Sequence, residues 1–419
     1  MLGFLFALAL ALDRTMIHLN HAGASPSPPI VLDTVNQHLK SEQKIGGYTA
    51  AAQAPLHSVH ESIRQLLGAS STDQIALTES ATMSWNRLFT STMAASDGTT
   101  ILVSQAEYAA SLVVACEWTR FHPECTLLQI PSDDQGRVDV NALDDMLEGK
   151  HRLVDGSILD PSSIAVVCVA HVPTNSGIVN PIVAIGERLL EQQPSIYYLV
   201  DACQSVGHIP LDVKAIHCHG LVGTGRKYLR GPRGTGFLYC AEADDLWPAH
   251  PSDHFALPIA SVPPQSRGEA VEKLLEYAPR SGARRFELWE SNVAARLGLG
   301  AAVDYYLQED RQARFDRILS LARHAYKRLG TVPSIRRYYE PMCGIVTFWV
   351  EGMSAEVVHA ELLEQNYELS VVPATSTPLD SSRTGVPNMV RASVSYTTTM
   401  DELDGFVEAL RSIVVAVQL

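Results

Sequence analysis

A chain of 419 residues with 46% hydrophobic content can bury a large core, and it is long enough for two or three domains. Its formal net charge of −14 argues against nucleic acid and anionic membranes as partners, because both favour a basic surface. Seven scattered cysteines without a C-x-x-C pair predict reduced thiols in a cytoplasmic protein, with neither disulfides nor a metal site.

The chain begins with an apolar run, MLGFLFALALAL, over its first twelve residues. This run has no preceding basic segment and no A-x-A-like cleavage site, and it is too short to span a bilayer. We expect residues 1–16 to form an extension that packs on the body of the protein or on a partner subunit. Secretion is the alternative.

The first expected helix covers residues 30–44 and stops at Gly46-Gly47. A strand is expected at residues 75–78, and the sequence Glu79-Ser80-Ala81-Thr82 then starts a helix through residue 89. Free N–H groups at a helix N-terminus bind anions, so this Ser/Thr-rich turn is a candidate phosphate site, although a plain N-cap would look similar.

Two further strands are expected at residues 100–104 and 164–170. Tyr108 follows the first of them, where an aromatic ring could stack on a planar ligand or pack in the core. The second is apolar throughout, which is typical of a central parallel strand. It is followed by Thr174-Asn175 and by an expected helix at residues 182–193, a right-handed crossover.

The most informative stretch contains an acid and a lysine at expected strand ends. An apolar run at residues 196–200 stops at Asp201, and another at residues 220–222 leads to Lys227. The carboxyl ends of parallel strands form a ligand crevice, so these two side chains could meet over one molecule. A lysine for Schiff-base chemistry and an acid for a pyridinium nitrogen together suit pyridoxal phosphate. Alternatively, Asp201 is a strand-end cap and Lys227 a surface residue.

The C-terminal part has the pattern of a smaller α/β layer. A surface loop is expected at residues 248–267 and a helix at residues 289–307, followed by strands at residues 344–350, 369–372 and 389–396 with a helix at residues 355–366 between them. Thr399 and Glu402 predict a capping box for the last amphipathic helix. Arg391 stands alone on its strand, and a buried guanidinium is unfavourable unless it meets an anion.

The Asp201–Lys227 stretch, DACQ followed by TGRK, resembles the lysine region of class V aminotransferases, which include cysteine desulfurases, kynureninases and isopenicillin N epimerase-like proteins. The resemblance runs from residue 17 over nearly the whole chain. It implies an α/β protein of PLP fold type I that forms a homodimer. The implied large domain, residues 17–291, has a mainly parallel seven-stranded sheet with helices on both faces, and residues 292–419 form a small C-terminal α/β domain.

The resemblance also implies a role for each residue that stands at a family position. Lys227 would bind the cofactor aldehyde and act as a base, Asp201 would hold the ring nitrogen, and Tyr108 would stack on the ring where desulfurases carry histidine. The other implied cofactor contacts are Ala81, Thr82, Thr174, Asn175, Gln204, Thr224, Arg226 and Arg284. The implied substrate contacts are Arg391, which would hold the carboxylate, and Asn20, His21 and Tyr48.

Residues 280–287, RSGARRFE, resemble a family segment that reaches across the dimer interface to the neighbour's phosphate. Ala283 replaces the hydroxyl residue of the desulfurases, so Arg284 or Arg285 would have to bind the phosphate. A surface charge cluster is the alternative.

The resemblance leaves the reaction open between elimination, epimerisation and transamination. RRFELWESNVAARLG is similar to segments of ergothioneine-type carbon–sulfur lyases and of isopenicillin N epimerase-like proteins. Desulfurases place a reactive cysteine shortly before the carboxylate-binding arginine, but residues 372–388 contain none, and Cys343 adjoins an apolar strand. We therefore expect β-elimination from a cysteine S-conjugate or sulfoxide. The alternatives are an epimerase or racemase, an aminotransferase, and a non-catalytic protein of this fold.

Overall fold

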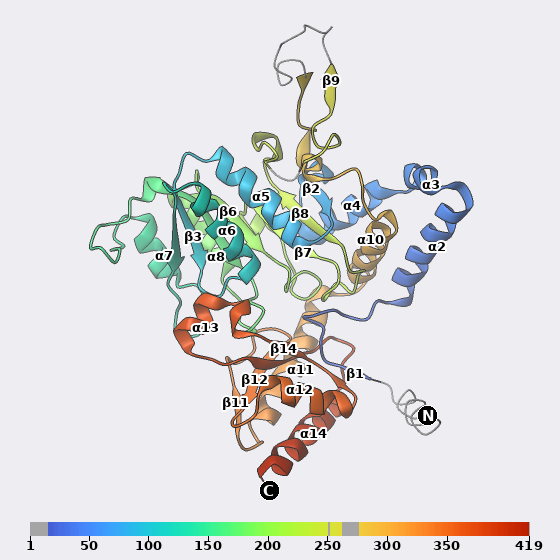
Figure 1. The fold of residues 1–419 in the computed structure, drawn as a ribbon, viewed down its shortest axis with the longest axis vertical. Coiled ribbons are helices and arrows are strands. Elements are labelled where there is room, and N and C mark those ends of the chain that lie inside the picture. The colour runs from blue at the N-terminus through green and yellow to red at the C-terminus, as the bar shows by residue number, and fades with distance from the viewer. Residues whose placement is uncertain (1–15, 250–251, 262–275, 419) are drawn as a thin grey trace.

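The computed structural model describes residues 16–249, 252–261 and 276–418. The chain forms a large layer on a seven-stranded sheet and a smaller layer on a four-stranded sheet (Figure 1). The large sheet has the order β2-β8-β7-β6-β5-β3-β4; β8 runs antiparallel to β2 and β7, and the other neighbours pair in parallel. Its strands are β2 (Ile75–Thr78), β3 (Thr100–Ser104), β4 (Thr126–Ile130), β5 (Ile164–Ala170), β6 (Tyr197–Asp201), β7 (Gly220–Thr224) and β8 (Gly236–Cys240). The mainly parallel sheet expected from the sequence is confirmed.

Helices cover both faces of the large sheet, because successive strand residues point to opposite sides. On one face, Leu199 and Val222 pack with Trp85 of α5 and Leu112 of α6. On the other face, Val200 of β6 packs with side chains from α4, α7, α8 and α10. The helices are α4 (Leu56–Leu67), α5 (Ala81–Ala95), α6 (Ala109–Phe121), α7 (Val140–Leu147), α8 (Ile182–Gln192) and α10 (Val293–Leu307), and the short α9 (Val213–Ile216) precedes β7.

The C-terminal layer is an antiparallel sheet with helices packed against it. Its strand order is β11 (Ile335–Arg337), β12 (Ile345–Val350), β15 (Met389–Ser393) and β14 (Ser370–Val372). The packed helices are α11 (Arg311–Leu329), α12 (Ala355–Glu364) and α14 (Met400–Gln418). The capping box of α14 is confirmed, since the Glu402 N–H donates to Thr399 Oγ1 at 3.2 Å and the Thr399 N–H donates to Glu402 Oε2 at 2.8 Å.

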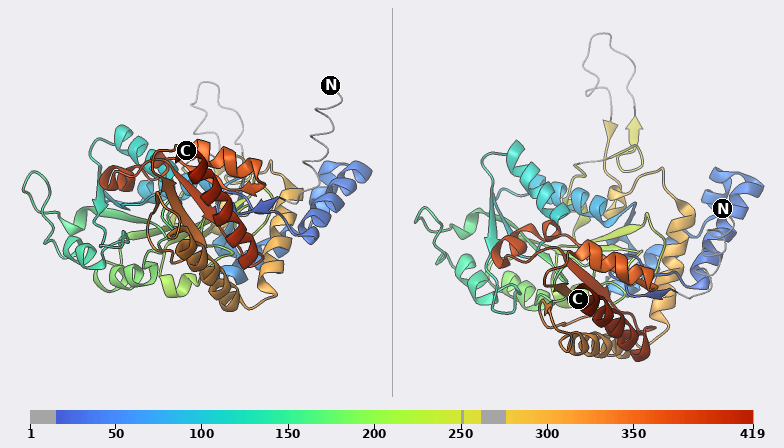
Figure 2. Two further views of the ribbon diagram at one scale, coloured as in Figure 1. Left: turned by 90° about the horizontal axis from the view of Figure 1, so that it is seen from below. Right: turned by 60° about the horizontal axis from the view of Figure 1, so that its bottom comes forward.

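The N-terminal segment connects the two layers. β1 (Ile17–His18) pairs in parallel with β13 (Tyr367–Glu368) of the C-terminal layer, and α2 (Pro29–Ile45) packs on α10 of the large layer. Figure 2 shows the C-terminal layer, in orange to red, on one side of the large layer, and the hairpin of β9 (Ile259–Ser261) and β10 (Glu276–Tyr277) on the other side.

The division between the hydrophobic cores differs from the boundary expected between residues 291 and 292. α10 begins after its N-cap Asn292, and its Leu299 and Val303 lie in the core of the large layer. The helix packs between α2 and α4, so it belongs to the large layer although the composition changes near it. The cores therefore divide after α10.

The Gly46-Gly47 pair, at which the first expected helix stops, lies between two helices. Gly46, with φ of 86°, ends α2, but Gly47 is already the first residue of α3 (Gly47–Gln53). The surface loop expected at residues 248–267 contains the short strand β9, which lies at the end of the part of this loop that the structure describes. The apolar run at residues 1–12 lies outside the described residues, and within the described part no helix is long and apolar enough to cross a membrane.

Candidate active site

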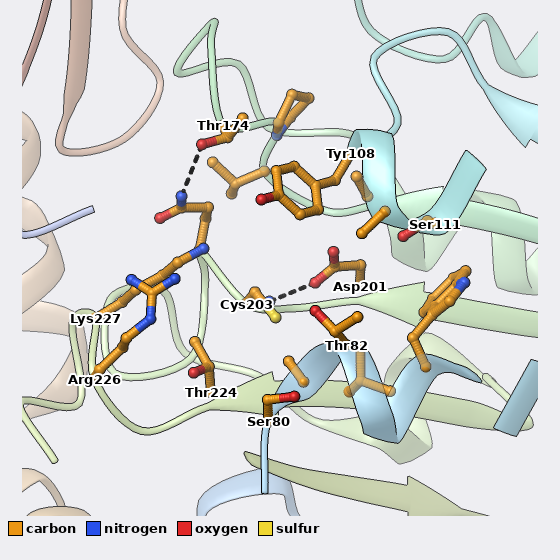
Figure 3. A pocket seen from close by; sticks show the side chains of 18 of the residues that line it. Ser80, Thr82, Tyr108, Ser111, Thr174, Asp201, Cys203, Thr224, Arg226 and Lys227 are labelled. Atoms are coloured by element: carbon orange, nitrogen blue, oxygen red, sulfur yellow. Dashed lines mark hydrogen bonds between the residues drawn. The ribbon is translucent and has the colours of Figure 1, made fainter. Parts of the chain in front are cut away.

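A pocket lies where the parallel strands of the large sheet end. Its walls come from the segments that follow β2, β3, β5, β6 and β7, so residues far apart in sequence meet there. Figure 3 shows Tyr108, Asp201 and Lys227 around this pocket. The expected site residues that line it are Ala81, Thr82, Tyr108, Thr174, Asp201, Gln204, Thr224, Arg226 and Lys227.

Asp201 and Lys227 are an acidic and a basic side chain that line the same pocket. Asp201 is the last residue of β6, and its Oδ1 accepts a hydrogen bond from the Cys203 N–H at 2.8 Å. Burial lowers the pKa of Lys227 to about 8, and the positive charge of Arg226 acts in the same direction. An amine with this pKa is partly neutral near neutral pH, so it can act as a nucleophile or as a base.

The N-terminus of α5 forms the anion-binding end of the pocket. The Ser80 hydroxyl caps the helix by accepting from the Met83 N–H at 3.2 Å. The N–H groups of Ala81 and Thr82 lie in the first helical turn, where no intrahelical acceptor precedes them. Gly236 of β8 permits this arrangement, because a side chain there would collide with the backbone of Ser80.

Thr174 links the large layer to the C-terminal layer. Its Oγ1 accepts from Gln204 Nε2 at 3.1 Å and from the Arg391 guanidinium at 2.7 Å. Two acceptor positions are thereby used, so the hydroxyl proton must point elsewhere, and the pocket that Thr174 lines offers that place. Gln204 Oε1 is buried without a hydrogen-bond partner among the described residues, so it can also accept from a ligand.

Arg391 lies on β15, and 4% of it is exposed. Its guanidinium also donates to the Thr174 carbonyl at 3.2 Å, while its Nε has no partner in the described part of the chain. Burial lowers the pKa of Arg391 to about 10, and none of the ion pairs among the described residues includes it. A guanidinium in this condition suits a substrate carboxylate.

Asn175 and the N-terminal residues do not line the pocket with their side chains. Asn175 Nδ2 donates to the Pro373 carbonyl at 3.0 Å, so it faces the C-terminal layer. Asn20 donates to Glu368 at 3.2 Å, and the buried His21 contacts Ser25 through Nδ1 at 2.9 Å. The backbone of their segment does reach the site, because the Ala22 carbonyl accepts from Gln204 at 3.2 Å and the Gly23 carbonyl accepts from Arg226.

Tyr48 and Arg284 also lie outside the pocket. Tyr48 is 76% exposed on α3, and its ring centroid lies 5.4 Å from that of Trp289. Gly46, with φ of 86°, joins α2 to α3, the helix that carries Tyr48. Arg284 is half-buried, whereas its neighbour Arg285 is buried and pairs with Asp244.

Two residues near Asp201 were not expected from the sequence. Cys203 lines the pocket, and Glu107 is fully buried next to the Asp201 charge. An acid three residues after the buried strand β3 is a signal that could have drawn attention to Glu107, since charged side chains are rarely fully buried unless they are paired.

The residues fit pyridoxal phosphate. The amine of Lys227 suits the aldehyde, Asp201 suits the ring nitrogen, and Tyr108 provides an aromatic face. The first turn of α5 provides N–H donors for the phosphate, and Thr224, whose hydroxyl donates to the Thr235 carbonyl at 3.3 Å, lines the same pocket. The unpartnered Gln204 oxygen provides a further polar contact.

Comparisons with known proteins agree with this fit. The family model described as aminotransferase class-V matches residues 17–406. The chain is 25% identical over 416 residues to a cysteine desulfurase of Synechococcus elongatus, an alignment that covers 96% of this chain and 61% of that protein. It is 27% identical over 417 residues to a cysteine desulfurase of Dickeya dadantii, covering 96% of this chain and 92% of that protein.

Solved structures share the fold. The cysteine desulfurase CsdA of Escherichia coli superposes with a TM-score of 0.78 at 21% identity, covering 96% of this chain and 95% of that one. The cystine C-S lyase C-DES, in complex with its reaction product cysteine persulfide, superposes with a TM-score of 0.75 at 20% identity, covering 94% of this chain and 97% of that one. The expected PLP fold type I is confirmed.

Proposed function

The chain belongs to the class V aminotransferase family of pyridoxal-phosphate-dependent enzymes, and from this premise we propose that it is a carbon–sulfur lyase that catalyses β-elimination from a cysteine S-conjugate or sulfoxide. The relatives named cysteine desulfurase support a cysteine-derived substrate. We expect that this chain does not form a protein-bound persulfide, because of the positions and the protonation of its own thiols.

The segment that precedes β15 carries the proposal. Residues 373–388 contain no cysteine and include the short helix α13 (Pro378–Thr384). The Pro373 carbonyl accepts from Asn175, so this segment borders the loop that carries Thr174. A persulfide-forming enzyme needs a mobile thiolate at such a place.

Outside this segment, the thiols of Cys343 and Cys203 lie near the site. Both are poorly suited to accept sulfur from a substrate. Burial raises the pKa of Cys343 to about 12, and its Sγ donates to the Gly177 carbonyl at 3.3 Å. Cys203 lines the pocket, but burial and the negative charge of Asp201 raise its pKa well above the ordinary value. Both groups are therefore neutral thiols at physiological pH.

In the proposed elimination, Arg391, Asp201 and Lys227 each have a different role. Pyridoxal phosphate, when bound, supplies the aldehyde that takes up the substrate amine and the ring that withdraws electrons from Cα. Arg391 holds the substrate carboxylate, and Asp201 holds a proton at the ring nitrogen. Lys227 Nζ can take the Cα proton, because its lowered pKa leaves it partly neutral. The electron pair of the Cα–H bond becomes the second Cα–Cβ bond while the Cβ–S bond breaks with its electron pair on sulfur. The sulfur takes up the proton that Lys227 removed and leaves as a thiol, or as a sulfenic acid from a sulfoxide. Water then converts the remaining aminoacrylate into pyruvate and ammonia.

The experiment that tests this function uses the purified holoenzyme with cysteine S-conjugates, cysteine sulfoxides, cysteine and unsubstituted amino acids. We expect pyruvate, ammonia and the released sulfur product from the substituted cysteines. Alanine from cysteine together with a protein-bound persulfide would contradict the proposal. Inversion at Cα without pyruvate would establish the epimerase alternative, and a keto acid that retains the substrate side chain would establish transamination.

We also propose that two copies form a homodimer in which Arg284 serves the partner's phosphate. Arg284 lies outside its own pocket, and the exposed rings of Tyr48 and Trp289 pack together at the surface near this segment. Contiguous exposed aromatic rings are typical of protein interfaces.

The seven cysteines are unpaired, which supports a reducing, cytoplasmic setting.

A further inference from the structure

Glu107 is a buried acid three residues after the end of β3, and its exposed fraction is 0%. Its Oε1 accepts from the Ser104 hydroxyl at 2.5 Å and from the Ala170 N–H at 2.5 Å. Its Oε2 is buried and has no hydrogen-bond partner among the described residues. One oxygen thus accepts two hydrogen bonds, and the other has no protein group among the described residues to stabilise a negative charge.

Among the described residues, the groups that bind Glu107 or act on it electrostatically carry no positive charge. They are the Ser104 hydroxyl on β3, the Ala170 N–H and the Cys168 thiol on β5, and the Tyr198 hydroxyl and the Asp201 carboxylate on β6. Burial raises the pKa of Cys168 and of Tyr198 well above their ordinary values, so both are neutral. Burial, with the like charge of Asp201, also raises the pKa of Glu107 to about 8 against the opposing effect of the Ser104 hydrogen bond. An unpaired carboxylate in such surroundings is less stable than the acid form.

Glu107 is connected to Asp201 through the sheet. Ala170, whose N–H binds Glu107 Oε1, pairs in register with Asp201 between β5 and β6. The next residue, His171, donates its N–H to the Asp201 carbonyl at 2.9 Å. The Glu107 carboxyl therefore fixes the strand end against which Asp201 is placed.

We propose that Glu107 is held as a neutral carboxylic acid and acts as a positioning residue for Asp201. Its Oε1 holds the end of β5 beside the end of β6, where Asp201 lies, and its neutral form places no negative charge next to that carboxyl group. The inference concerns cofactor placement, so it holds whichever reaction the enzyme catalyses.

Glu107→Gln is the decisive variant, because glutamine has the shape and hydrogen-bonding pattern of the protonated acid. The amide oxygen can accept from Ser104 and Ala170, and the amide nitrogen takes the place of the protonated Oε2. We expect Glu107→Gln to keep its dissociation constant for pyridoxal phosphate within about twofold of wild type, and Glu107→Ala to weaken binding about tenfold or more. Reconstitution with added cofactor, followed by absorbance, measures both constants.

Two readouts separate this role from simple packing. Infrared spectra of the holoenzyme at pH 7 should contain a C=O band of a protonated carboxylic acid that Glu107→Gln removes. The folded pKa of about 8 lies above the ordinary value of 4.5, so the folded state binds the extra proton and wild-type stability falls as pH rises between these values. Glu107→Gln removes this loss, and its gain in Tm should be larger at pH 8 than at pH 5 by about 3 °C or more.

Glu148→Gln is the matched control, because Glu148 is exposed and pairs with Lys150 at the surface. It should leave the infrared band, the pH dependence of Tm and the cofactor affinity unchanged. The proposal is overturned if the band survives in Glu107→Gln, if the Tm difference is the same at both pH values, or if Glu107→Gln loses the cofactor as strongly as Glu107→Ala. Failure of the alanine variant to fold leaves the glutamine measurements decisive.

Discussion

The side-chain hydroxyl of Thr174 accepts a hydrogen bond from the Arg391 guanidinium at 2.7 Å. Thr174 follows β5 of the large sheet, whereas Arg391 lies on β15 of the C-terminal layer. The bond joins the part of the site that suits the cofactor to the part that suits a carboxylate. A substitution at Thr174 should therefore alter the position of the Arg391 guanidinium.

We expect Thr174→Val to raise the KM of the amino-acid substrate about tenfold, because Arg391 and Gln204 each lose a hydrogen-bond partner in buried surroundings. Thr174→Ser keeps the hydroxyl and should stay within about twofold of wild type, so it is the matched control. Steady-state kinetics with saturating cofactor measure both. An unchanged KM in the valine variant would show that this hydroxyl does not position Arg391.

Lys227 should carry the cofactor, because it lines the pocket and burial lowers its pKa to about 8. Borohydride reduction of the holoenzyme followed by peptide mapping should place the label on Lys227, and Lys227→Ala should remove it. Lys214, which is exposed on α9, is an internal control that should remain unlabelled. Label on Lys214, or none in the wild type, contradicts the assignment.

The composite dimer site is tested by mixing two inactive variants. We expect Lys227→Ala and Arg284→Ala to be weakly active alone and to regain activity when their subunits are exchanged, because one hybrid site contains both native residues. Arg285→Ala is a poor choice for this purpose, since Arg285 donates to the Leu246 carbonyl at 2.9 Å inside its own chain and its loss should lower Tm. Wild-type activity and cofactor affinity in Arg284→Ala would exclude the cross-subunit role.

Cys203→Ala should retain elimination activity within about threefold, because a neutral thiol supplies no nucleophile. The same holds for Cys343→Ala if the variant folds, and its Tm serves as the check. Product formation from an S-substituted cysteine measures both. Loss of turnover in Cys203→Ala, together with a persulfide on Cys203 in the wild type, would return the enzyme to the persulfide-forming class.

The central site residues could be predicted because their positions follow from strand ends. Asp201 stands directly after an apolar run and Lys227 three residues after the end of β7, and parallel strands bring such residues to one edge of the sheet whatever the sequence of the helices between them. The turn at Ser80 was recognisable in the same way, since a capped helix N-terminus has a local signature.

Residues whose position depends on tertiary packing could not be placed. Tyr48 was expected near substrate and does not line the pocket of its own chain, and the sequence pattern did not reveal that Gly46 separates two helices there. The side chain of Asn175 turns toward Pro373, which is distant in sequence. Glu107 was missed because its significance lies in the groups that surround it, and these come from three different strands.

The site depends on contacts between the two ends of the chain. Ala22 donates its N–H to the Ser393 hydroxyl at 2.9 Å, the Ala22 carbonyl holds Gln204, and β1 pairs with β13. During synthesis, residues 17–25 emerge from the ribosome well before residues 367–393 and cannot take up these positions until the later strands appear. Cofactor-competent protein should therefore arise only after translation is almost complete, and ribosome-bound chains that stop before β13 should hold the large sheet without a finished pocket.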